Sequence, residues 1–157
     1  MASGGKKTPS STASSSTNAT KTTTIAGLNQ PANDGKFQFT VTSVQCNQPE
    51  VGSNQYLTKT AQGQYCLLNL SVKNIGNEAQ TLDASNQYIF NSQGQKFSAD
   101  STASIYANPS DSTFLDSINP GNSVTGIFAF DLPKGVTPTY AILHDSAFSD
   151  GVKVNLQ

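Results

Sequence analysis

The chain has 157 residues, enough for one domain with a tail, and only 12% of them are charged, against roughly 25% in a typical globular domain. The net charge is −1, and all nine basic residues are Lys. Without the guanidinium fork that reads phosphates and guanine edges, nucleic-acid binding is disfavoured, and so is a hold on an anionic membrane surface by charge alone.

Residues 1–33 are predicted to form a disordered Ser/Thr-rich linker. Between Ala2 and Thr24 there are 13 Ser or Thr and three Lys, but no acid and no aromatic residue. Such a segment buries too little apolar surface to offset its conformational entropy. The sequence has no signal-peptide core and no apolar run of about 18 residues, so any export signal has been removed from it. The stretch SGGKK resembles the residues after the lipidated cysteine of bacterial lipoproteins; an ordinary frayed terminus is the alternative.

The predicted folded domain spans residues 34–157, and its first strand covers residues 36–46. The apolar side chains of this strand change parity once, from Phe37, Phe39 and Val41 to Val44 and Cys46. A β-bulge near Thr42 and Ser43 would put both groups on one face. The polar stretch 47–62 is predicted to be a loop, with a short edge strand around residues 55–57.

The clearest alternation in the chain is at residues 64–74, which we interpret as the central strand. Its buried parity consists of Cys66, Leu68, Leu70 and Val72. The other parity is polar apart from Tyr65 and Leu67, as in a strand with one face buried and one in water. Because Leu67 is apolar on the outer parity, we expect the outer face to be partly covered there.

Two cysteines in a chain of this composition favour one disulfide bond, Cys46–Cys66, and an oxidising compartment. The alternative is two unrelated buried thiols. A zinc site is less favoured, because two Cys and one His supply too few clustered ligands. The disulfide would join the first strand to the central strand.

Turn signals divide the rest of the chain into short strands. A turn at 74–77 precedes a weak strand at 79–83, and Gly94 supplies the tight turn of a hairpin between 86–91 and 95–98. Residues 101–108 fit a helical turn or a loop. The sequence NPGN at 119–122 predicts a type II turn. Three further strands are predicted at 124–132, 139–144 and 151–156, the first with Ala129 facing outward.

Seven to nine short strands without a helical period imply an all-β fold, an immunoglobulin-like antiparallel β-sandwich. The chain has no Trp, and its two Cys are only 20 positions apart. The cross-sheet Cys, Trp, Cys arrangement of antibody domains is therefore absent.

From Gly63 onward the sequence resembles the bacterial domain of unknown function 4352 family. The pieces that carry the resemblance are VKNIGNEAQ, QGQKFSAD, INPGNSVTG and FDLPKG. The resemblance implies a sandwich similar in architecture to the mycobacterial immunoprotective extracellular antigen. It also implies a cell-envelope setting, either as a lipoprotein or as a secreted protein, and it implies no reaction.

Two loops carry the residue types of catalytic or metal chemistry. His144, Asp145 and Ser146 contain the three residue types of a hydrolase triad, but neighbours on a strand point to opposite faces and no nucleophile elbow exists. Calcium would suit the acidic loops near Asp111 and Asp150, but the EF-hand spacing is absent, and turn-capping by Asp is the favoured interpretation. We therefore expect no catalytic, cofactor-binding or metal-binding residue.

Surface modification and partner binding remain possible from the sequence. Asn18 and Asn69 match the N-glycosylation pattern, the latter within a strand, and the linker suits O-glycosylation better. Five Tyr, with Leu67 and Ile127, would mark a partner surface if they formed an exposed patch. The favoured interpretation places them under loops or at the sandwich ends: Tyr56, Tyr65, Tyr88, Tyr106 and Tyr140.

We therefore expect a non-enzymatic, monomeric module outside the cytoplasm, lipid-anchored or secreted, that contacts a protein or glycan partner at the cell surface. We expect no cofactor and no nucleic-acid partner. We expect membrane attachment only through a lipid anchor, which is absent from this sequence. The competing hypothesis is a small hydrolase or a metal-dependent activity on the loops near His144 and Asp150.

Overall fold

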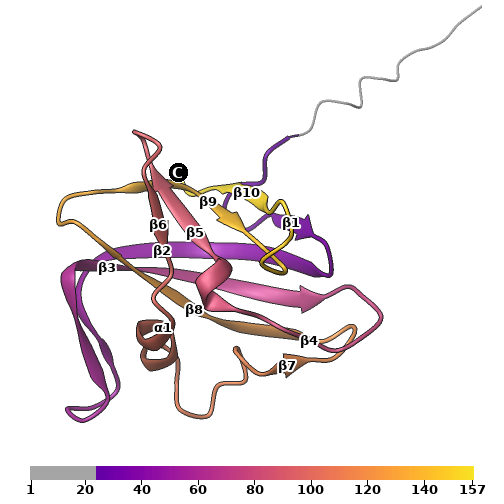
Figure 1. The fold of residues 1–157 in the computed structure, drawn as a ribbon, viewed down its shortest axis with the longest axis horizontal. Helices are drawn as coiled ribbons and strands as arrows, with labels where there is room; N and C mark the ends of the chain where they lie inside the picture. The colour runs from indigo at the N-terminus through magenta and orange to yellow at the C-terminus, as the bar shows by residue number, and fades with distance from the viewer. Residues whose placement is uncertain (1–23) are drawn as a thin grey trace, which may run out of the picture.

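The computed structural model describes residues 24–157, which form two four-stranded antiparallel sheets and a two-stranded ribbon (Figure 1). The all-β sandwich predicted from the sequence is confirmed. Residues 1–23 of the predicted linker, with Asn18, lie outside the described residues. The elements are β1 (Pro31–Asp34), β2 (Phe37–Gly52), β3 (Thr58–Asn74), β4 (Gln80–Thr81), the 3₁₀ turn η2 (Ala84–Asn86), β5 (Tyr88–Asn91), β6 (Lys96–Ser98), α1 (Ser101–Ala107), β7 (Ser117–Ile118), β8 (Ser123–Leu132), β9 (Pro138–Leu143) and β10 (Val152–Asn155).

The first sheet has the order β1-β2-β3-β8, with β3 central as predicted. The predicted bulge is present, because the β2–β3 register shifts between Val41 and Ser43. This shift keeps the buried side chains of β2 and β3 on one face of the sheet, where Cys66, Leu68, Leu70 and Val72 are at most 2% exposed.

The second sheet has the order β10-β9-β5-β6 and covers the apolar face of the first. The predicted hairpin is β5–β6, and Gly94 in its turn has φ +78°, a conformation that favours glycine. Phe114 packs against Phe128 in the core, with ring centroids 5.0 Å apart. A Cβ on Gly126 would lie 2.1 Å from the Phe114 ring, so only glycine fits beneath it. Truncating a core ring such as Phe128 would cost about 3–5 kcal/mol.

The stretch 47–62 is not a loop, which corrects the sequence prediction. β2 continues to Gly52 and β3 begins at Thr58, so the two strands form a long hairpin, and residues 55–57 lie in its turn instead of an edge strand. We call residues 47–63 the hairpin arm. It bends away from the sandwich at the lower left of Figure 1. The polar composition of this stretch is typical of a loop. Here the backbone N–H and carbonyl groups are instead hydrogen-bonded between β2 and β3.

The folded domain also begins earlier than the predicted boundary at residue 34. β1 pairs with β2 at the edge of the first sheet, and Ala26 forms a parallel bridge with Val154 of β10. The N–H of Asn155 donates to the carbonyl of Ala26. Residues 26–34 therefore cover sheet edges that would otherwise be unpaired.

Residues 101–107 form a helix, α1, which packs on the outer face of the first sheet. The alternation placed Tyr65 and Ala129 on the outer face. Both are 0% exposed, because they form a cluster with Val51 and with Ala103 of α1. Leu67 and Tyr106 border this second, smaller core. The expectation that the outer face is covered near Leu67 is thus confirmed, although the extent of the cover was underestimated.

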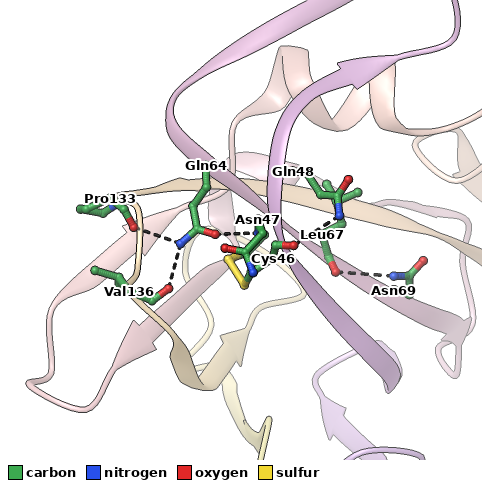
Figure 2. Close-up of a disulfide and its surroundings, with 9 residues drawn as sticks. Cys46, Asn47, Gln48, Gln64, Leu67, Asn69, Pro133 and Val136 are labelled. Atoms are coloured by element: carbon green, nitrogen blue, oxygen red, sulfur yellow. Dashed lines mark hydrogen bonds between the residues drawn. A yellow bond between two sulfur atoms is a disulfide. The ribbon is translucent and has the colours of Figure 1, made fainter.

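The Cys46–Cys66 disulfide is present and lies at the bend of the hairpin arm (Figure 2). The β2–β3 register jumps there, from Gln45 opposite Leu67 to Gln48 opposite Tyr65. Gln64, which is 4% exposed, accepts from the N–H of Asn47 at 2.6 Å. Its amide nitrogen donates to the carbonyls of Pro133 and Val136, both at 3.0 Å. The disulfide thus ties β2 to β3 at the bend, and Gln64 ties the bend to the β8–β9 turn.

Candidate functional site

The outer face of the first sheet carries a groove of about 630 Å³, within the usual range of ligand sites. Its floor comes from β2, β3 and β8, and its wall is the segment that follows α1, from Asn108 to Thr113. We call it the polar groove. Its hydroxyl, amide and carboxyl side chains are Thr42, Asn69, Ser71, Asn108, Asp111, Ser112, Thr113, Ser123 and Thr125.

The floor of the polar groove follows from strand periodicity. In the β3–β8 register, Ser71 lies opposite Thr125 and Asn69 lies opposite Ile127. Residues of one parity share a face, so the same alternation that buries Leu70 turns Ser71 outward. The inner face builds the core, and the outer face presents hydroxyl and amide groups.

The wall of the groove is held at both ends by buried residues. At one end, the side chain of Asn108, 8% exposed, accepts from the N–H of Ile127 and donates to its carbonyl, both at 2.9 Å. Ser104, which is buried in α1, accepts from the N–H of Ala129. At the other end, Phe114 is anchored over Gly126. Because Asn108 and Ser104 bond the free edge of β8, they both close that edge and position the wall.

Most polar side chains of the groove have no bond to the protein. Thr42 donates to the Asn69 carbonyl, and the Ser112 hydroxyl accepts from the N–H of Phe114. The other hydroxyls make no hydrogen bond within residues 24–157: Ser71, Thr113, Ser123 and Thr125. Asp111 is the one charged side chain of the lining, and no Lys contributes to it. The groove is therefore an array of free hydrogen-bonding groups with little charge.

A second pocket, of about 400 Å³, adjoins the polar groove. It lies between the hairpin arm and the end of α1, and Asn108 and Pro109 line both cavities. Its other walls include Val51, Leu67 and Tyr106, and its one charged residue is Glu50. This arm pocket is thus more apolar than the polar groove and opens beside it.

An ion pair between Lys59 and Asp100 joins the hairpin arm to the start of α1. Asp100 caps the helix by accepting from the N–H of Ala103 at 3.0 Å. Burial alone would raise the pKa of Asp100, but the hydrogen bond from Ala103 and the nearby Lys59 hold that pKa below its ordinary value. The hydrogen bond that Lys59 donates to the Asp100 carboxylate raises the pKa of Lys59. Burial, followed by the charge of Asp100, raises the pKa of Tyr65 beneath them.

The structure does not assemble a triad at His144. Its ring is half-buried and packs edge-on against Tyr88, with centroids 5.5 Å apart. Its Nδ1 is buried and has no hydrogen-bond partner in the described part of the chain. The backbone of His144 bonds Gln87 at 2.8 Å and 2.9 Å. The neighbouring carboxylate of Asp145 accepts from the N–H of Lys36 instead of orienting the imidazole.

Asp111 and Asp150, which were considered for calcium, accept no hydrogen bond within residues 24–157, so neither caps a turn there, whereas other acidic side chains do accept backbone N–H groups. Asp131 accepts from the N–H groups of Gln62 and Gly63, and Asp83 accepts from Ser85. Asp145 caps the turn at Lys36. Within residues 24–157, no three His, Cys, Asp or Glu side chains gather as a metal site would require.

The five tyrosines do not form one patch. Tyr56 is 83% exposed in the turn of the hairpin arm, whereas Tyr65 is fully buried. Tyr88 and Tyr140 lie on the outer face of the second sheet, each with a Lys ammonium about 4 Å from its ring centroid: Lys96 at 4.0 Å and Lys153 at 4.2 Å. Tyr106 alone lines a cavity next to the polar groove.

The polar groove was missed by the sequence interpretation, although its parts were visible. The outer parity of the central strand was known to be polar, and the stretch 108–116 was one of the loops considered for chemistry. What the sequence could not show is that α1 turns this loop over the outer face. The hydroxyls then line a hollow instead of a flat, solvated surface.

Solved structures confirm the sandwich. The secreted protein MPT63 from Mycobacterium tuberculosis aligns with a TM-score of 0.61 and 13% identity, over 84% of this chain and 96% of that one. The yjhA protein of Bacillus subtilis aligns with a TM-score of 0.60 and 16% identity, over 85% and 100%. The B. subtilis protein ycdA, a candidate lipoprotein, aligns with a TM-score of 0.53 and 17% identity, over 80% of this chain and 38% of its own. At such identities the likeness shows the fold alone.

The sequence comparisons agree with the resemblance identified above. No curated protein matches this sequence. In residues 24–157 there is no helix of the length and hydropathy that spanning a bilayer requires. The family described as Domain of unknown function (DUF4352) matches residues 26–154, nearly all of the described chain. The chain therefore belongs to the DUF4352 family.

Proposed function

We propose that this protein is a non-enzymatic, monomeric module outside the cytoplasm, lipid-anchored or secreted, that binds a glycan at the cell surface through the polar groove. The observation that carries the proposal is the set of unpaired side-chain hydroxyls in a cavity of ligand size: Ser71, Thr113, Ser123 and Thr125. Specific ligand sites depend on a few placed polar groups of this kind.

The chemistry of the polar groove suits a polyhydroxylated, uncharged ligand. Hydroxyl side chains both donate and accept. The amide nitrogen of Asn69 already donates to the Leu67 carbonyl at 3.5 Å, so its oxygen is the atom that a ligand can bond. Sugars carry the same dual hydroxyl groups on most of their ring carbons. Asp111 is the only charge in the lining, so a phosphorylated or strongly acidic polymer would meet a like charge without a compensating Lys.

The extracytoplasmic location is supported by two independent observations. A disulfide in a small β-domain is typical of oxidising compartments. One structural neighbour, MPT63, is a secreted protein. The hydrolase or metal-site alternative gains no support, because His144 contacts Tyr88 and its own backbone partner Gln87 instead of an acid.

Titration of the purified protein with neutral sugars, followed by amide NMR, tests the proposal. The probes are N-acetylglucosamine and maltose and their longer oligomers. We expect shifts at the amides of Ser71, Thr113 and Thr125, and a weaker affinity for Ser71→Ala and Thr125→Val. Ser98→Ala, an exposed serine on the second sheet, is the matched control and should bind like the parent.

The non-enzymatic part of the proposal is tested in the same samples. Long incubation should leave the length of every oligomer unchanged by mass spectrometry. Shortened products that vanish in His144→Ala would favour the hydrolase. If no sugar shifts any amide of the protein, the proposal that the polar groove binds a glycan is wrong.

A further inference from the structure

The arm pocket and the polar groove are two parts of one surface. Asn108 and Pro109 line both, so a molecule that leaves the polar groove over these residues enters the arm pocket directly. Asn108 is fixed because its amide nitrogen donates to the carbonyl of Ser104 in α1 at 2.6 Å and to the carbonyl of Ile127 in β8 at 2.9 Å. The boundary between the two cavities is therefore a rigid ridge.

The two cavities differ in chemistry in a way that suits successive sugar units. A pyranose has a hydroxyl-bearing edge and an apolar C–H face. The polar groove offers partners for the edge, while the arm pocket offers the half-buried ring of Tyr106 beside Leu67 and Val51. A tyrosine ring buries apolar surface and still presents its hydroxyl to solvent or ligand.

The charges of the combined surface argue for an uncharged chain. Asp111 is the one charged residue in the lining of the polar groove, and Glu50 is the one charged residue in the lining of the arm pocket. Both are negative. A polyanionic polymer would be repelled at each position, whereas a neutral chain would not.

The outer wall of the arm pocket is fixed before any ligand arrives. The disulfide and Gln64 hold the bend of the hairpin arm (Figure 2). The Lys59–Asp100 ion pair ties the arm to the start of α1. A preformed wall spares the ligand the cost of ordering it, which strengthens binding.

We propose that the arm pocket is a second subsite of the polar groove, so that the ligand is a neutral oligosaccharide of at least two units that crosses Asn108 and Pro109. Tyr106 is the residue that gives longer chains their extra affinity. This inference rests on the proposed function of the polar groove.

A chain-length series tests the inference. The purified protein is titrated by calorimetry and NMR with N-acetylglucosamine and glucose, and with their β-1,4- and α-1,4-linked oligomers. We expect an affinity gain of about tenfold from monomer to oligomer in one series, the factor that about 1.4 kcal/mol of added contact gives. In Tyr106→Ala the oligomer should bind no better than the monomer does in the same variant.

Two controls separate loss of the ring from damage to the helix. Tyr106→Leu keeps an apolar side chain against the small core and should also lose the length effect. Ile105→Ala removes an exposed apolar side chain from the same helix and should retain the effect. Equal affinity for all lengths, or a length effect that survives in both Tyr106 variants, would overturn the second subsite while leaving the proposed function intact.

The failure of the proposed function has a different signature. If no sugar of any length binds, the polar groove itself is not a glycan site. If polygalacturonate binds as tightly as the neutral oligomers, the argument from Glu50 and Asp111 is wrong, and the inference of a neutral chain falls with it.

Discussion

The outer faces of the two sheets differ in whether their side chains have partners within the protein. On the second sheet, the rings of Phe90 and Tyr140 stack with centroids 4.7 Å apart and planes 7° apart, and Lys153 covers Tyr140. These groups satisfy one another. On the first sheet, the hydroxyls of Ser71 and Thr125 have no protein partner and lie in a cavity. On the aromatic face of the second sheet the side chains are thus paired with one another. On the polar face of the first sheet the hydroxyls are free to bond a ligand.

This difference shows that residue type alone does not mark a binding surface. Tyr and Lys on an exposed sheet suggest an interface by composition. Here four of them form two cation–π pairs within the sheet, at distances of 4.0 Å and 4.2 Å. Unpaired groups inside a hollow are the better guide, because a ligand can bond them without displacing a protein contact.

Removing the disulfide should have the largest effect on stability, and its local part should lie in the hairpin arm. In the chain-entropy model, a loop closed by cysteines 20 positions apart stabilises the fold by about 3 kcal/mol. Replacing Cys46 and Cys66 by Ala should lower the free energy of unfolding by about that amount. Denaturant titration measures the loss.

Amide exchange in the same double variant should locate the change. We expect faster exchange in the hairpin arm and at the bend near Gln64, with little change in β5 and β9 beyond the global loss of stability. An acceleration in the hairpin arm no larger than the one in β5 and β9 would mean that the disulfide does not hold the arm.

Replacing Asn108 by Leu should affect both stability and the polar groove. The backbone N–H of Ile127 would lose its acceptor, and an unsatisfied buried group costs about 1–3 kcal/mol. The wall of the groove would also lose its anchor, so sugar affinity should fall with stability. Ser110→Ala, in the same segment but exposed, should change neither quantity. An Asn108→Leu protein of parental stability and affinity would remove this residue from the account.

Replacing Tyr140 by Leu should destabilise the protein without touching ligand binding. The lost ring stack and cation–π contact predict a cost of about 0.5–1.5 kcal/mol. Thermal unfolding measures this cost, and the sugar titration should give the parental affinity. A clear loss of sugar affinity would mean that the second sheet, and not the first, faces the ligand.

The smallest predicted effect is a pH dependence at the Asp100 cap. Its pKa is lower in the folded chain than in the unfolded chain, so its stabilisation is complete above the unfolded value of about 3.9 and is lost as pH falls through the folded value. The parent should therefore lose more stability between about pH 5 and pH 2 than Asp100→Asn does. Equal slopes in acid denaturation would show that the cap contributes nothing.

Local patterns predicted most of the sandwich. The alternation of β3, the bulge near Thr42, the turn at Gly94 and the disulfide each follow from residues close in sequence, and the structure confirms them. The prediction of a loop at the hairpin arm was wrong, and at α1 the sequence left a helical turn and a loop as alternatives. Polar residues that pair in a ladder look like a loop, and a helix of seven residues shows too little periodicity.

The candidate site was harder to predict because it depends on non-local packing. Nothing near Tyr65 or Ala129 in the sequence indicates that α1 covers them. The sequence also does not show that Asn108 bonds the edge of β8, 19 positions away. The groove arises from that contact, so its floor could be predicted as polar but its shape could not.

An NMR map of the oligosaccharide complex tests the central claim most directly. The full chain is titrated with the tightest neutral oligomer, and amide shifts are compared between the two sheets. We expect amide shifts at Ser71, Thr113 and Thr125 in the polar groove and at Tyr106 in the arm pocket, and no shifts in β5 and β9. Shifts confined to Tyr88 and Tyr140, or no shifts at saturating sugar, would contradict it.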